Sequence, residues 1–158
     1  MNSPFKCNIL HLDFPTRKEV SYEADVYNSW GIAMKLGTIH HIAVICSDKT
    51  AALEFYHEKL GFRIIRENYR PERGDWKIDL EMGDCELELF IMKDHPPRLS
   101  PEAYGLRHLA FKVESVDRLV AELEEKGIPC EPVRTDTFTG EKMTFFHDPD
   151  GLPIEIHE

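Results

Sequence analysis

An internal repeat constrains the fold of this chain more than any other feature of its sequence. A shift of 67 residues places His-Ile-Ala-Val, beginning at His41, on His-Leu-Ala-Phe, beginning at His108. The same shift places Glu88 on Glu155, so each histidine precedes its glutamate by 47 residues (88 − 41 and 155 − 108). A repeat of this length predicts two similar structural units that fold from the same pattern of strands and helices.

Hydrophobic periodicity and turn residues predict the same order of elements in both halves. In the first half we expect a strand at 38–46, a helix at 48–60, and strands at 62–69, 76–82 and 85–92. In the second half we expect a strand at 106–113, a helix at 115–126, and strands at 130–133, 142–147 and 152–157. Asp48 is a suitable helix N-cap, and Gly61 and Gly127 follow the two helices as stop signals. Each half therefore predicts a strand, a helix and three more strands.

The repeat also sets the expected domain organisation. Residues 1–36 hold no sustained hydrophobic period and are interpreted as an N-terminal extension, with a short helix near 22–30. An alternative is that the natural start is Met34. Residues 37–158 form one domain, with module one at 37–93, a linker at 94–104 around Pro96-Pro97, and module two at 105–158.

Charge and hydropathy exclude several classes of function. The chain carries 29 acidic and 19 basic residues, a formal net charge of −10, which argues against nucleic-acid or anionic-membrane partners because both require a basic face. No run of about 18 apolar residues is present, and no secretory signal opens the sequence. The four cysteines show no Cys-x-x-Cys spacing. We therefore expect a cytoplasmic protein with a small-molecule substrate.

Strand alternation places the two repeated pairs on comparable faces. Side chains alternate across a strand, and His41, Glu88, His108 and Glu155 each lie opposite the apolar face of their strand. A pseudo-twofold axis relating the two units would bring these faces together. Two imidazoles and two carboxylates form a donor set suited to one divalent ion, with Ni²⁺ or Zn²⁺ favoured and Co²⁺, Mn²⁺ or Fe²⁺ as alternatives. Four protein ligands leave positions for water or substrate.

Each of these residues also has an ordinary structural interpretation. A single histidine in a strand is commonly structural, and a glutamate at a sheet edge is commonly solvated. The equal separation of the two pairs favours the metal site over these interpretations. Glu86 shares a face with Glu88 and is the alternative ligand if the strand register differs from the expected one. His40 and His157 are candidates for contacts with the ligands.

Four segments carry a resemblance to a known family: IHHIAV, ELELF, GLRHLAF and DPDGLPIEI. They resemble the vicinal oxygen chelate superfamily, also called the glyoxalase/bleomycin-resistance/dioxygenase group, over residues 37–158. The stretch at 69–80 is similar to bacterial glyoxalase I-like proteins. The resemblance implies an α+β fold of two βαβββ modules that form a paired, partly open β-sheet cleft with the metal at its floor. It assigns the ligands to His41, Glu88, His108 and Glu155.

The resemblance also implies an activity. A glutamate at 88 favours glyoxalase I over members that use three ligands or carry glutamine there. The implied reaction converts a hemithioacetal of a 2-oxoaldehyde such as methylglyoxal into a 2-hydroxyacyl thioester through an enediolate, with Glu155 as the base and Glu88 assisting. The alternatives are thiol transfer, epimerisation, Fe²⁺-dependent dioxygenation, or small-molecule binding without catalysis. A homodimer is expected.

One position departs from the family pattern. Glyoxalase I proteins often carry an arginine four residues after the first ligand, where it meets the carboxylate of the thiol substrate, and here that position is Ile45. Glutathione is therefore not assigned as the thiol. The candidate replacements are four basic residues: Lys77, Arg98, Arg107 and Lys112.

Overall fold

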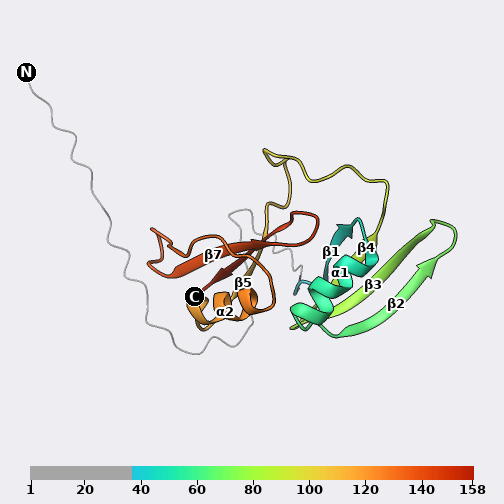
Figure 1. Ribbon diagram of the computed structural model, residues 1–158. Coiled ribbons are helices and arrows are strands. Elements are labelled where there is room, and N and C mark those ends of the chain that lie inside the picture. Colours follow the sequence, from blue (N-terminus) through green and yellow to red (C-terminus); the bar gives the residue numbers. More distant parts are fainter. Residues whose placement is uncertain (1–36) are drawn as a thin grey trace, which may run out of the picture. The chain divides into compact units, whose positions relative to one another are not determined.

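The computed structural model describes residues 37–158, which contain two four-stranded mixed β-sheets, each accompanied by one helical segment (Figure 1). The expected extension at 1–36, the helix near 22–30 and the alternative start at Met34 lie outside the described residues. Both sheets are open, and the predicted α+β fold with two βαβββ modules is confirmed.

Module one contains the first sheet. Its elements are β1 (His41–Cys46), α1 (Lys49–Leu53) continuing as the π-helical segment η1 (Glu54–Lys59), β2 (Ile64–Arg70), β3 (Asp75–Met82) and β4 (Cys85–Ile91). The strand order is β1-β4-β3-β2, with β1 parallel to β4 and the other neighbours antiparallel. Asp48 caps α1 as predicted, because its carboxylate accepts a 2.8 Å hydrogen bond from the Ala51 amide.

Module two repeats this topology. Its elements are β5 (Leu109–Lys112), α2 (Val116–Glu125), β6 (Arg134–Thr135), β7 (Lys142–His147) and β8 (Pro153–His157). The strand order β5-β8-β7-β6 matches that of module one, and β5 is parallel to β8. Ser115 caps α2 by accepting from the Arg118 amide. The equal topology of the two sheets is the structural counterpart of the sequence repeat.

The predicted strand at 130–133 is wrong. Cys130 makes an isolated bridge to Phe146, and the paired strand β6 begins four residues later, at Arg134. Pro132 lies inside the predicted strand, and a proline has no amide hydrogen to donate to a sheet ladder. The backbone therefore reaches the edge of β7 through separate bonds, including Glu131 amide to Phe145 carbonyl at 2.8 Å.

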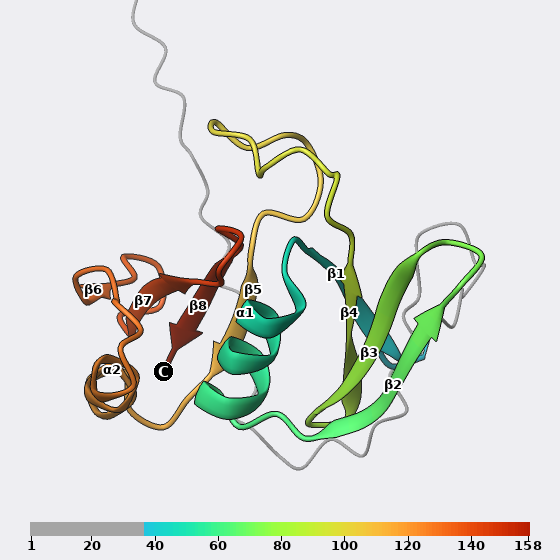
Figure 2. The ribbon, with the colours of Figure 1, turned by 45° about the vertical axis from the view of Figure 1, so that its right-hand side comes forward.

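The helical segment of module one also packs against module two (Figure 2). The Tyr56 hydroxyl donates a buried 2.8 Å hydrogen bond to Asp148, and the rings of Phe55 and Phe146 have centroids 6.2 Å apart. Phe62 and Phe111 form a second aromatic contact at 6.2 Å. The two modules therefore share a buried junction.

The helices of residues 37–158 are too short and too polar for any of them to cross a membrane.

Candidate metal centre

The first predicted pair comes from two adjacent parallel strands of module one. His41 opens β1, and the register of β1 with β4 pairs it with Glu86 and pairs Ala43 with Glu88. The His41 imidazole and the Glu88 carboxylate therefore project from the same face of the sheet, with Nε2 and Oε2 3.8 Å apart. We call His41 and Glu88 half-site one.

The second pair occupies the equivalent place in module two. His108 directly precedes β5, and Glu155 lies on the adjacent parallel strand β8. The distance from His108 Nε2 to Glu155 Oε2 is 2.9 Å. The Phe145 ring packs edge-on against the imidazole with centroids 5.3 Å apart. We call His108 and Glu155 half-site two.

The donor chemistry and spacing of both half-sites fit a divalent ion. Two donors bound at about 2.0–2.2 Å and at right angles to each other lie about 3 Å apart. Half-site two has this spacing at 2.9 Å, and half-site one is more open at 3.8 Å. The Nδ1 atom of His108 is buried and has no hydrogen-bond partner within residues 37–158. Each half-site thus presents one nitrogen and one oxygen donor.

The described chain brings each pair together but does not gather all four residues. Clusters of three donor residues whose ligand atoms lie within 4.8 Å of one another occur twice in residues 37–158, at Cys46/Asp148/Asp150 and at Asp79/Glu86/Glu88. Neither cluster combines donors from half-site one with donors from half-site two. The single chain therefore presents two separate half-sites.

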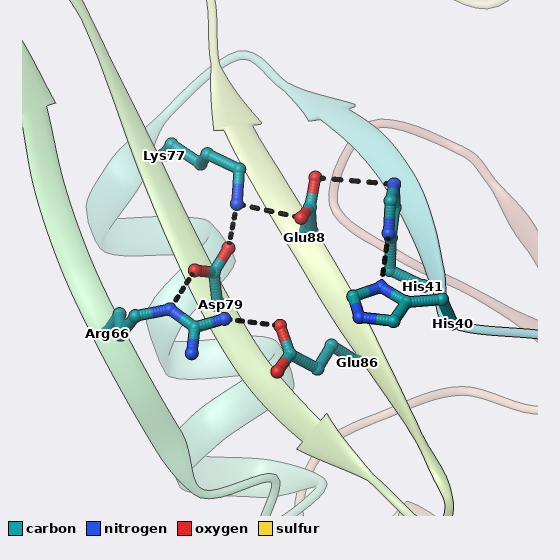
Figure 3. A network of polar contacts seen from close by, with 7 residues as sticks. All are labelled: His40, His41, Arg66, Lys77, Asp79, Glu86 and Glu88. Atoms are coloured by element: carbon teal, nitrogen blue, oxygen red, sulfur yellow. Dashed lines mark hydrogen bonds and ion pairs between the residues drawn. The ribbon is translucent and has the colours of Figure 1, made fainter.

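A network of charged side chains surrounds half-site one (Figure 3). Lys77 on β3 donates to Glu88 Oε1 at 2.7 Å and to Asp79 Oδ1 at 2.5 Å. Arg66 on β2 donates to the second oxygen of Asp79 at 2.7 Å and to Glu86 at 2.5 Å. Glu86, the alternative ligand, is therefore bound by a guanidinium.

Proton affinities in this network follow from its charges. Burial acts to lower the pKa of Lys77, but its hydrogen bonds to Asp79 and Glu88 outweigh burial and raise the pKa above its ordinary value. Burial acts to raise the pKa of Asp79, but the hydrogen bonds from Lys77 and Arg66 hold it below its ordinary value. The hydrogen bonds between Lys77 and Asp79 therefore favour the charged form of both side chains.

Sequence reasoning missed how this network surrounds Glu88. Lys77 and Asp79 stand two residues apart on β3, so they share one face, and β3 pairs Asp79 directly with Glu88. The sequence signal was this alternation of charged residues inside an otherwise apolar strand. The two neighbouring histidines have local partners: His40 Nδ1 lies 2.9 Å from His41 Nδ1, and His157 contacts the Glu158 carbonyl and Asp136.

The four basic residues considered for substrate binding lie in different places. Lys77 contacts half-site one. Arg98 lines a cavity of about 720 Å³ with Ile45, but its guanidinium donates to the carbonyls of residues 106 and 107. Arg107 is exposed and lies 3.6 Å from Glu102, and Lys112 is exposed on β5. Lys77 is thus the member of this set in contact with a predicted ligand.

The cluster at Cys46, Asp148 and Asp150 belongs to the junction between the modules. Burial raises the pKa of the Cys46 thiol to about 12 and also raises the pKa of Asp148. The Asp148 carboxylate accepts from Tyr56 and from the amides of residues 150 and 152, and Asp150 accepts from the Ser47 amide. These bonds account for both carboxylates structurally.

Comparison with known proteins identifies relatives of this sequence. A family model described as Glyoxalase/Bleomycin resistance protein/Dioxygenase superfamily matches residues 38–156. The uncharacterized protein YwkD of Bacillus subtilis is 56% identical over 127 residues, which is 79% of this chain and 99% of that protein. Glyoxylase I 4 of Arabidopsis thaliana is 31% identical over 137 residues, which is 80% of this chain and 73% of that protein.

A solved structure gives the same result for the fold. The crystal structure of the glyoxalase family protein from Enterococcus faecalis has 57% sequence identity and a TM-score of 0.77. It covers 79% of this chain and 100% of that chain.

Proposed function

Because the chain belongs to the Glyoxalase/Bleomycin resistance protein/Dioxygenase superfamily, we propose that it is a metal-dependent isomerase of glyoxalase I type. Its substrate is the hemithioacetal of a 2-oxoaldehyde such as methylglyoxal, and its product is a 2-hydroxyacyl thioester. One observation carries the proposal: both His/Glu pairs of the repeat turn a nitrogen and an oxygen donor toward each other, at 3.8 Å and 2.9 Å. A protein that bound small molecules without a metal ion would not require both His/Glu pairs.

The complete centre in this proposal contains His41, Glu88, His108 and Glu155, and a homodimer assembles it. Each chain offers two separate half-sites, and the His41 side chain is 44% exposed. In a twofold dimer, half-site one of one chain can meet half-site two of its partner, which produces two equivalent centres. The isolated chain would then be inactive because neither half-site has four donors.

The divalent ion, Ni²⁺ or Zn²⁺ by preference, supplies Lewis-acid stabilisation of negative charge on the substrate oxygens when it is bound. The side chains of this protein provide the remaining chemistry. Glu155 removes a proton from the hemithioacetal carbon and returns it to the neighbouring carbon, so that the enediolate becomes the 2-hydroxyacyl product. His108, packed against Phe145, fixes one side of the centre.

The thiol part of the substrate is less defined than the oxoaldehyde part. Ile45 is 51% exposed and lines the 720 Å³ cavity with Arg98 and Leu106. Ile45 is apolar and cannot pair with a carboxylate of the thiol. This favours a thiol whose binding does not depend on a carboxylate at this position. A panel of thiols is therefore needed to test the activity.

The decisive experiment strips the purified protein of metal and reconstitutes it with Ni²⁺, Co²⁺, Zn²⁺ or Mn²⁺ in separate samples. Isomerisation of methylglyoxal is then followed with glutathione and other low-molecular-weight thiols. We expect activity to return with Ni²⁺ or Co²⁺ and at least one thiol. No turnover with any thiol, together with oxygen uptake in the presence of Fe²⁺ and a catechol, would replace this proposal with dioxygenase chemistry.

A further inference from the structure

The two oxygens of the Glu88 carboxylate face different partners. Oε1 accepts from the Lys77 ammonium at 2.7 Å, while Oε2 faces His41 Nε2 at 3.8 Å (Figure 3). The lysine therefore engages the oxygen that points away from the imidazole. Any ion shared by His41 and Glu88 has Oε2 within direct reach.

Lys77 is itself held in place. Its ammonium also contacts Asp79, a residue that is only 1% exposed. Arg66 donates a 2.7 Å hydrogen bond to the other oxygen of Asp79. Asp79 stands directly opposite Glu88 across the β3–β4 pair, and two carboxylates in directly opposite positions repel each other. A cation bridging both removes the repulsion. The pairing of β3 with β4 therefore fixes the contact between Lys77 and Glu88.

Half-site two has no such arrangement. In the β7–β8 pair, Phe145 stands opposite Glu155, as Asp79 stands opposite Glu88 in module one. Met143 takes the place of Lys77, since it pairs with His157 as Lys77 pairs with Phe90. Within residues 37–158, no lysine or arginine forms an ion pair with Glu155.

From this asymmetry, and resting on the proposed function, we infer that Lys77 is a positioning residue that limits Glu88 to one donor oxygen. The ammonium occupies Oε1, so Glu88 offers Oε2 alone and leaves room in the centre for both substrate oxygens. A carboxylate that binds through both oxygens would occupy one of those places. With Glu88 tied to Lys77, the carboxylate free to exchange a proton with substrate is Glu155.

The test replaces Lys77 by the residue found in the equivalent place of module two, Lys77→Met. Metal-free wild-type and variant proteins, both full length, are titrated with Co²⁺ while calorimetry and visible absorption are recorded. We expect the variant to bind Co²⁺ equally tightly or up to about tenfold more tightly, because a positive charge beside the ion is gone. We also expect its visible absorption to weaken, because a second Glu88 oxygen raises the coordination number.

Two further variants complete the design. Lys77→Arg keeps a cation beside Oε1 and should restore the wild-type absorption. Lys49→Met removes another lysine of module one that pairs with Glu67 and stacks on Trp76, away from the half-site, and should leave the Co²⁺ spectrum unchanged. Turnover of Lys77→Met should fall about 10- to 100-fold in kcat, since misplaced ligands misalign substrate.

The outcomes separate the inference from the proposed function. An unchanged Co²⁺ spectrum in Lys77→Met, or affinity weakened by the roughly 10- to 100-fold typical of lost outer contacts, overturns the positioning role. If wild-type protein binds Co²⁺ but turns over no thiol adduct, the proposed reaction fails while the spectra still decide the role of Lys77. If wild-type protein takes up no Co²⁺, both ideas fail.

Discussion

Half-site one and half-site two carry the same two donor residues in different surroundings. Glu88 of half-site one lies in a chain of charges through Lys77, Asp79 and Arg66. Glu155 of half-site two lies across the sheet from Phe145, whose ring also packs on His108. The first pair is open at 3.8 Å and the second is closed at 2.9 Å.

This comparison separates what the repeat preserved from what it did not. The positions of the donors follow from the register of the parallel strand pair, which is the same in both modules. Glu88 pairs with Ala43 in module one, and Glu155 pairs with Ala110 in module two. The neighbouring strand then determines whether each carboxylate is ion-paired or packed against an aromatic ring. Equal donors in unequal surroundings suit a centre in which one carboxylate holds the ion and the other moves a proton.

The largest expected effect comes from removing each carboxylate in turn. Glu155→Gln should reduce kcat at least about 1,000-fold, within the range expected for loss of a general base, while the metal still binds. Glu88→Gln should instead weaken metal affinity and retain measurable turnover once the centre is saturated with metal. Steady-state kinetics at saturating Ni²⁺ and calorimetric metal titration measure the two effects.

Equal losses in kcat for both variants would show that the two carboxylates share the proton transfer. Reversed losses would assign the base to Glu88 and remove the functional meaning of the asymmetry. Circular dichroism on each variant serves as the folding control, since both changes are isosteric.

The next effect concerns the junction that keeps both modules in one structure. Tyr56→Phe removes a buried donor to Asp148 and should lower the free energy of unfolding by about 1.5–3 kcal/mol, as for other hydrogen bonds to charged groups. Tyr69→Phe is the matched control, because Tyr69 is 51% exposed and its ring packs on Trp76. Urea unfolding followed by fluorescence compares the two, and an equal cost in both variants would contradict the role of the junction.

The cost of Tyr56→Phe should also depend on pH. Burial raises the pKa of Asp148 in the folded protein, so the carboxyl holds its proton more tightly when folded than when unfolded. Such a group contributes stability at low pH that is lost as pH rises through the folded pKa. The Tyr56 hydroxyl opposes this shift, so its removal should cost least in acid and more as the pH approaches neutrality. A cost that is constant with pH would separate Tyr56 from the ionisation of Asp148.

The sequence predicted the parts of the structure that follow from local pattern. Both helices, the cap at Asp48 and the strand Lys142–His147 were predicted from periodicity and turn residues, whereas the cap at Ser115 was found only in the structure. The strand expected at 130–133 was wrong because Pro132 interrupts the ladder and pairing begins at Arg134. The hydrophobic pattern at 130–133 favoured a strand, but the missing amide hydrogen of Pro132 prevents regular pairing there.

The candidate site was predicted less completely, for a reason of geometry. The repeat predicted His41, Glu88, His108 and Glu155 as candidate ligands, but sequence spacing does not say whether donors from two modules meet within one chain or between two. The contact of Lys77 with Glu88 depends on the β3–β4 register, which pairs residues 79 and 88. Cross-strand register is a long-range property, so the charge network became visible only in three dimensions.

The smallest expected effect tests the aromatic side of the comparison. Phe145→Leu keeps an apolar residue beside Glu155 but removes the edge-on ring contact with His108 at 5.3 Å. Such aromatic contacts contribute about 0.5–1.5 kcal/mol, so we expect metal affinity to fall up to about tenfold with kcat at saturating metal nearly unchanged. Phe138→Leu, at a 97% exposed position of the same module, is the control for metal titration by calorimetry. A loss of kcat as large as that of Glu155→Gln would mean that Phe145 positions Glu155 for the proton transfer. Half-site two would then depend on a neighbouring side chain as half-site one depends on Lys77.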